Sequence, residues 1–188
     1  MSGQDAVLRE LVNLLPRGKT RAATTWELGL GRSLNGAQDE GGLLLERAVP
    51  QNPKDPTPHW LLVHLGEASI SQRIAHLEAL ARSSKSARSA ARFYFEVGEL
   101  HQRERGDHGR ALECFLHAVN RDPQASEAAG RAAALFRTQG QYEDLALLLE
   151  GRLARIDDPS VRLAVLRELA QLKVQGKWGE LPESDTYA

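Results

Sequence analysis

The fold of this chain is decided by residues 93–123, which read FYFEVGELHQRERGDHGRALECFLHAVNRDP. Apolar residues recur at helical spacing on both sides of Gly106. Gly106 can end the first helix because a glycine accepts left-handed backbone angles, and Pro123 cannot continue the second. The apolar positions are Phe93, Val97 and Leu100 before the turn and Ala111, Leu112, Phe115, Leu116 and Val119 after it. This pattern predicts a helical hairpin, and one hairpin alone cannot bury both of its apolar faces.

The same order of features returns along the chain with a period in the mid-thirties. Gly106 is followed 34 residues later by Gly140, and Gly176 comes 36 residues after that. Upstream, Gly36 and Pro53 stand 17 residues apart, as do the turn glycine and the final proline of the first stretch. Paired helices with this period indicate stacked hairpins, in which each hairpin covers an apolar face of the next.

This pattern resembles the tetratricopeptide repeat over roughly residues 21 to 178. That family has small residues where the two helices of a hairpin cross, large residues nearby, and a proline after the second helix. The matching positions are Gly98, Ala111, Ala118 and Pro123, with Tyr94 and Phe115 as large residues, and in the first copy Gly29, Gly41, Leu45, Ala48 and Pro53. The chain departs from the pattern at Trp26, which sits one residue late, and at Leu145 and Arg152, which replace the usual alanines.

The resemblance implies an all-α fold, a right-handed superhelix (α-solenoid) of about four and a half hairpins. The expected segments are a capping helix in 1–20, hairpins at 21–55, 56–86, 87–123 and 124–159, an incomplete hairpin at 160–178, and a polar tail in 179–188. Asp5 is placed to cap the first helix and Ser86 to cap the third hairpin. The proline-rich residues 50–58 predict a rigid turn that no helix crosses.

Bulk composition argues against several classes of protein. The net charge of −1 gives no basis for attraction to nucleic acid or to an anionic membrane. The one cysteine, Cys114, excludes an internal disulfide framework and suits a reducing compartment. No apolar run is long enough to span a membrane, and the N-terminus lacks the pattern of a secretion signal. We therefore expect a cytoplasmic protein that binds neither nucleic acid nor membrane.

Motifs for catalysis or cofactor binding are fragmentary. Residues 18–20 (GKT) look like the end of a phosphate loop, but Asn13 takes the place of the first glycine and no strand precedes it. Cys114 and His117 lie three residues apart on one helix and could bind a soft metal, yet no CxxC or HExxH motif accompanies them. We expect no enzyme activity, no cofactor, no metal and no small-molecule substrate.

Recognition of another protein is the function that these observations leave. In the tetratricopeptide repeat, the first helix of each hairpin lines the concave side of the array. The residues that the resemblance places in such a groove are Arg92, Phe95, Glu99, Arg103, Arg131, Arg137, Arg167 and Lys173. Cations predominate there, which predicts an adaptor or scaffold that binds an acidic helix or peptide. The alternative is that the arginines pair with Glu96, Glu99 and Glu127 and hold adjacent hairpins together.

The C-terminal hairpin looks unfinished. Residues 160–175 form an apolar helix, but Pro182 and the polar residues after it stop a partner helix. The uncovered face marks an interface unless Trp178 and Leu181 fold back over it. The possible interface residues are Leu166, Leu169, Leu172 and Trp178. We leave three alternatives for what would cover this face: a second copy, another protein, or further repeats of a longer array. Homodimerisation through this face is the alternative function.

Overall fold

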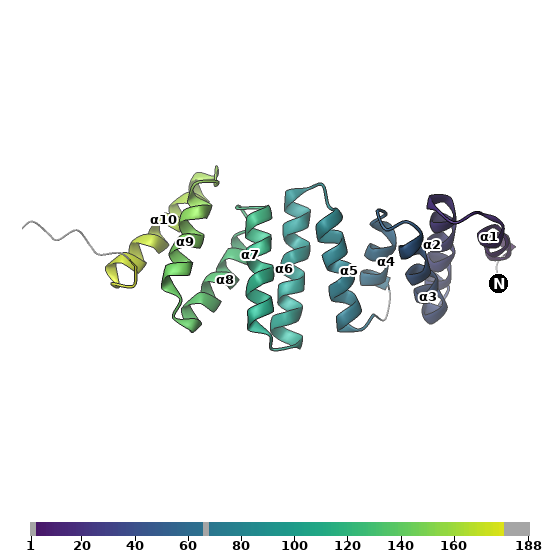
Figure 1. Cartoon of the computed structure of the whole chain (residues 1–188), viewed down its shortest axis with the longest axis horizontal. Coiled ribbons are helices and arrows are strands. Elements are labelled where there is room, and N and C mark those ends of the chain that lie inside the picture. The colour runs from purple at the N-terminus through teal and green to yellow at the C-terminus, as the bar shows by residue number, and fades with distance from the viewer. Residues whose placement is uncertain (1–2, 66–67, 179–188) are drawn as a thin grey trace, which may run out of the picture. The chain divides into compact units, whose positions relative to one another are not determined.

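The computed structural model of the chain describes residues 3–65 and 68–178 (Figure 1). Within these ranges it has ten α-helices, one 3-10 helix and no strand, with a helix content of 79%, so the predicted all-α class is confirmed. The α-helices are α1 (Gly3–Leu14), α2 (Lys19–Leu34), α3 (Gln38–Ala48), α4 (Thr57–Leu65), α5 (Ile70–Ser83), α6 (Ala87–Glu104), α7 (His108–Arg121), α8 (Ser126–Gln139), α9 (Tyr142–Leu153) and α10 (Pro159–Val174). The chain divides into two compact units, Met1–Lys85 (unit 1) and Ser86–Ala188 (unit 2).

In two of the hairpins, the two helices cross at positions where the sequence has glycine. In unit 1, α2 meets α3 at Gly29 and Gly41, and a Cβ atom on Gly41 would lie 2.7 Å from the carbonyl oxygen of Gly29. In unit 2, α6 meets α7 at Gly98, where a Cβ atom would lie 2.5 Å from the ring of Phe115. Both distances are far below a normal contact of about 3.5–4.0 Å. Only glycine lets these helices approach so closely, which confirms the prediction of small residues at the crossings.

Glycines and caps set the helix boundaries in unit 2. Gly106 follows α6 with φ 64° and Gly140 follows α8 with φ 71°, left-handed values that glycine adopts without steric cost. Asp107 caps α7, because its Oδ1 accepts the N–H of Arg110 at 2.9 Å. Ser86 caps α6 as predicted: its hydroxyl accepts the N–H of Ser89 at 3.3 Å.

The proline-rich residues 50–58 are helical at both ends, which the sequence did not lead us to expect. α3 continues into the 3-10 helix Val49–Gln51, and α4 starts at Thr57. Pro50 and Pro58 lie in first turns, where a helix does not need the N–H that proline lacks. Only residues 52–56 interrupt the helices.

At the N-terminus, α1 begins at Gly3, so Asp5 lies inside the helix and the predicted cap is wrong. The shift is within the usual spread of one or two residues at helix ends. The helix ends at Leu14, two residues before Pro16, where the sequence predicted a stop. α1 packs against α2.

Within unit 2, α6 to α10 follow one another in chain order, and their main contacts join consecutive helices (Figure 1). α7 packs on α8 through Ala118, Val119, Ala128 and Ala129. α8, α9 and α10, with the turn after α9, share a larger buried cluster of Ala133, Phe136, Leu145, Ala146, Leu149, Ile156, Val165, Leu169 and Leu172. Each hairpin of unit 2 therefore buries an apolar face against the next.

The described part of the chain ends shortly after α10. Gly176 takes φ 63°, and Lys177 Nζ then donates to the hydroxyl of Tyr142 at 3.0 Å, at the start of α9. Trp178 packs against the buried cluster of α8, α9 and α10. It therefore folds back over α10, which the sequence analysis gave as the alternative to an uncovered face. Leu181, Pro182 and the predicted tail 179–188 lie outside the described residues.

Candidate protein-binding surfaces

The first helices of the hairpins in unit 2, α6, α8 and α10, are joined by ion pairs. Glu99 Oε1 of α6 lies 3.1 Å from Arg131 Nη2 of α8, and Arg137 of α8 pairs with Glu168 of α10. Glu99 also pairs with Arg103, one turn along α6. Because the pairs to Arg131 and Arg137 cross between helices, these arginines contribute to the packing of unit 2.

Four of the six predicted groove cations have acidic partners within the chain, so their charge is partly neutralised before any ligand binds. Arg92 pairs with Glu96 at 3.2 Å on the same helix, and Arg103, Arg131 and Arg137 have the acidic partners described above. The alternative in which arginines hold hairpins together is found for Arg131 and, with Glu168 as partner, for Arg137. No pattern in the sequence pointed to Glu168, because the side of α10 that faces α8 depends on how the two helices cross.

A cleft of about 340 Å³ lies between α6 and the start of α8, and we call it the α6–α8 cleft. Its lining includes Arg88, Arg92, Phe95, Asp122, Ser126 and Glu127. Arg88 and Arg92 are exposed, whereas the ring of Phe95 is half-buried, 5.6 Å from that of Phe115 between centroids. Two cations and two acids share the lining, so the cleft suits a single carboxylate beside an apolar side chain better than a long acidic run.

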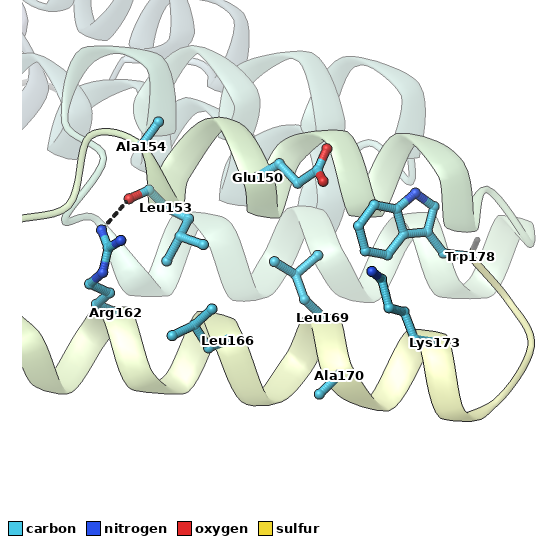
Figure 2. A pocket seen from close by; sticks show the side chains of 9 residues that line it. All are labelled: Glu150, Leu153, Ala154, Arg162, Leu166, Leu169, Ala170, Lys173 and Trp178. Atoms are coloured by element: carbon cyan, nitrogen blue, oxygen red, sulfur yellow. Dashed lines mark hydrogen bonds between the residues drawn. The ribbon is translucent and has the colours of Figure 1, made fainter. Parts of the chain in front are cut away.

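A second hollow, the α9–α10 groove, measures about 550 Å³ (Figure 2). Leu153 of α9 and Leu166 and Leu169 of α10 form an apolar floor, and Trp178 closes the end beside Lys173. Lys173 Nζ lies 4.8 Å from the centroid of the Trp178 ring, close enough for a cation–π interaction. The remaining charged groups of the lining are Glu150 on α9 and Arg162 on α10.

The four predicted interface residues do not share one environment. Leu169 and Leu172 are only 8% and 3% exposed and belong to the buried cluster of unit 2. The chain itself thus covers this part of the face that we expected to be open. α10 turns Val165, Leu169 and Leu172 toward α9, which fits their i, i+4, i+7 spacing. Leu166 remains 44% exposed, and Trp178 is half-buried.

Two histidines in unit 1 come together without any sequence motif. His59 Nδ1 of α4 lies 3.0 Å from His76 Nδ1 of α5, and His76 Nε2 lies 3.1 Å from Glu46 Oε1 of α3. Burial, followed by the nearby charge of His76, lowers the pKa of His59. Seventeen residues separate the histidines along the chain, so only the packing of three helices brings this group together.

The other chemical candidates from the sequence lie apart. Cys114 is buried in α7, whereas His117 is exposed and its ring stacks on that of Tyr94 at 5.3 Å. Among the described residues, no group of three or more His, Cys, Asp and Glu side chains is arranged to hold a metal ion. In the same part of the chain, no helix combines the length and the apolar character needed to cross a membrane.

The chain fits no protein-family model, and no curated protein matches it in sequence. The resemblance to the tetratricopeptide repeat therefore rests on the residues quoted above. Gly98 and Gly41 lie at close helix crossings. Leu145, one of the departures, is fully buried in the core of unit 2.

Proposed function

We propose that this chain is a protein-interaction module of the tetratricopeptide type, a non-enzymatic adaptor or scaffold that works in the cytoplasm. In this proposal its hairpins are turns of a right-handed α-solenoid, and its ligand is a peptide or helix that carries an acidic residue. The observation that carries the proposal is the α6–α8 cleft, where Arg88, Arg92 and Phe95 surround an open space of about 340 Å³.

Recognition in the α6–α8 cleft needs one acidic and one apolar side chain. Guanidinium groups bind carboxylates through two parallel hydrogen bonds, and both Arg88 and Arg92 are exposed. Arg92 already pairs with Glu96 at 3.2 Å. An exposed pair within one helix contributes about 0.3–0.5 kcal/mol, so a ligand carboxylate can replace Glu96 at little cost. Phe95 provides an apolar contact beside the arginines.

Selection from a displayed library of random peptides tests the proposal. We expect the full chain to enrich short peptides with Asp or Glu beside Leu, Ile or Phe, and Arg92→Glu to weaken the binding of those peptides. Arg82→Glu is a matched control, because Arg82 is also an exposed arginine that pairs with a glutamate one turn away, at 3.2 Å. The proposal is contradicted if none of the enriched acidic peptides binds more weakly after the double change Arg88→Glu and Arg92→Glu.

Self-association is the second candidate function, and the exposed Leu163 and Leu166 on α10 favour it. In that case α10 of one copy covers α10 of another, and the chain is a structural subunit. Light scattering at two protein concentrations separates the candidates. A mass that rises toward the dimer supports self-association, and a monomer mass at both concentrations leaves the peptide-binding proposal.

A further inference from the structure

The α9–α10 groove is a second surface, and it shares no residue with the α6–α8 cleft (Figure 2). The groove follows the helix axes: Leu166, Ala170 and Lys173 line it along α10 at i, i+4 and i+7. This stripe runs about 10 Å along the helix. Glu150 and Leu153 line the groove along α9. Two helices that present such parallel rows form the kind of groove in which a third helix packs.

The charge of α10 decides what kind of helix fits. Arg162 and Lys173 are the exposed cations of this helix that line the groove, and its one acid, Glu168, is paired with Arg137. If a second copy placed its own α10 in the groove, cations would face cations, because both helices carry the same excess of positive charge. A helix with acidic residues beside its apolar stripe meets the opposite charge.

The two cations of the groove lie at its opposite ends. Arg162 is held at one end, where its Nη1 donates to the carbonyl oxygen of Leu153 at 2.8 Å. Lys173 stands at the other end, against the ring of Trp178. Glu150 faces them from α9 (Figure 2). A bound helix thus meets positive charge along its α10 side and a carboxylate on its α9 side.

We propose that the α9–α10 groove binds an acidic amphipathic helix of another protein. The apolar stripe of that helix covers Leu153, Leu166 and Trp178, and its acidic residues pair with Arg162 and Lys173. This is a binding site in addition to the α6–α8 cleft, and the two sites are tested by different variants.

The probe is a fluorescein-labelled helical peptide of about 18 residues, slightly longer than α10. It carries Leu at the first and fourth positions of each heptad and Glu at the flanking positions, and a companion peptide carries Lys in place of Glu. Fluorescence anisotropy with the full chain measures both affinities. We expect the Glu peptide to bind at least about tenfold more tightly than the Lys peptide.

Variants of the groove identify the site. We expect Leu166→Asp and Ala170→Glu each to weaken binding of the Glu peptide at least about tenfold. Both residues are exposed, so the fold tolerates the changes, and circular dichroism checks this. Arg162→Glu with Lys173→Glu should reverse the preference between the peptides. The matched controls are Leu147→Asp, an exposed leucine of α9 outside the groove lining, and Arg167→Glu, a cation of α10 outside it. Arg92→Glu in the other cleft should also change little.

Four results overturn the proposal. The first is equal binding of the two peptides, and the second is an effect of Leu147→Asp as large as that of Leu166→Asp. The third is a dimer in sedimentation that Leu166→Asp dissociates, because a second copy then occupies the groove. The fourth is a tenfold gain in peptide affinity when residues 179–188 are removed, because this chain's own acidic tail is then the occupant. An affinity that stays within about twofold after that removal supports a partner helix.

Discussion

Arg152 Nε donates to the carbonyl oxygen of Pro123 at 3.1 Å, and this bond ties α9 to the turn that follows α7. Arg152 is buried, and burial lowers its pKa from the usual arginine value. The resemblance to the tetratricopeptide repeat puts an alanine at this position. The longer side chain reaches back to the preceding hairpin, so the departure from the pattern adds a contact between hairpins of unit 2.

Replacing Arg152 by alanine should destabilise unit 2 by about 1–3 kcal/mol, because the change leaves the Pro123 carbonyl without this partner. Urea denaturation followed by circular dichroism measures the loss. Arg155→Ala is the control, since exposed Arg155 makes a similar bond from Nη2 to the carbonyl oxygen of Asn120 at 2.8 Å. We expect a smaller loss there, and equal losses would show that burial of Arg152 is not the cause.

Gly98→Ala should destabilise the α6–α7 hairpin by about 1–3 kcal/mol, because the new methyl group overlaps the ring of Phe115 and forces a shift in packed helices. Gly130→Ala is the matched control. Gly130 lies within α8, and a Cβ atom there would meet nothing within 4 Å. Alanine at that position should stabilise the protein by about 0.5–1 kcal/mol through helix propensity. Thermal denaturation of the two variants should thus give shifts of opposite sign, and a stabilising Gly98→Ala would disprove the close crossing.

Glu99 and Arg131 should show a coupling energy of about 0.5–1 kcal/mol in a double-mutant cycle, at the upper end for exposed pairs. The Glu99 side chain is only 16% exposed, so solvent screens this pair incompletely. Arg110 and Glu113, at 65% and 60% exposure, form the comparison pair and should couple by less than about 0.5 kcal/mol. Urea denaturation of both cycles at two salt concentrations provides the measurement. Equal couplings would mean that Glu99 does not link the hairpins.

Unit 1 should lose stability as the pH falls below about 6.5, the ordinary pKa of histidine. His59 has a lowered pKa in the folded protein, first through burial and then through His76. The unfolded chain therefore binds a proton more readily, and the stabilisation present above the unfolded pKa is lost as the pH falls toward the folded pKa. Glu46 and Asp55 oppose this shift, and Arg82 adds to it.

Urea midpoints at pH 7.5, 6.5 and 5.5 measure that loss. His59→Gln should flatten the dependence over this range, because glutamine does not titrate. A slope that is the same in His59→Gln and in wild type contradicts the prediction.

The sequence predicts those features that depend on a single residue type at a fixed spacing. Gly106 and Gly140 end helices because few other residues accept their backbone angles, and Ser86 caps α6 through its own hydroxyl. Features that depend on how two helices cross could not be predicted from the sequence. The pairing of Arg137 with Glu168 and the contact between His59 and His76 both depend on such crossings. The spacing of residues along the sequence does not predict either contact.

The surfaces were predictable to the same extent. Arg92 and Phe95 do meet in one cleft, because helical spacing alone puts them on one side of α6. Leu166 and Leu169 share one helix, yet one remains exposed and the other is buried. The rotation of α10 about its axis decides that difference, and this rotation follows from its packing against α8, α9 and the turn after α9.

Cys114, the one cysteine of this chain, lies buried in α7. Because Cys114 is only 8% exposed, a maleimide in solution should alkylate its sulfur much faster once the surrounding helices separate. Its rate of labelling therefore reports how often the third hairpin, α6–α7, opens locally. Mass spectrometry can follow this rate without any engineered reporter.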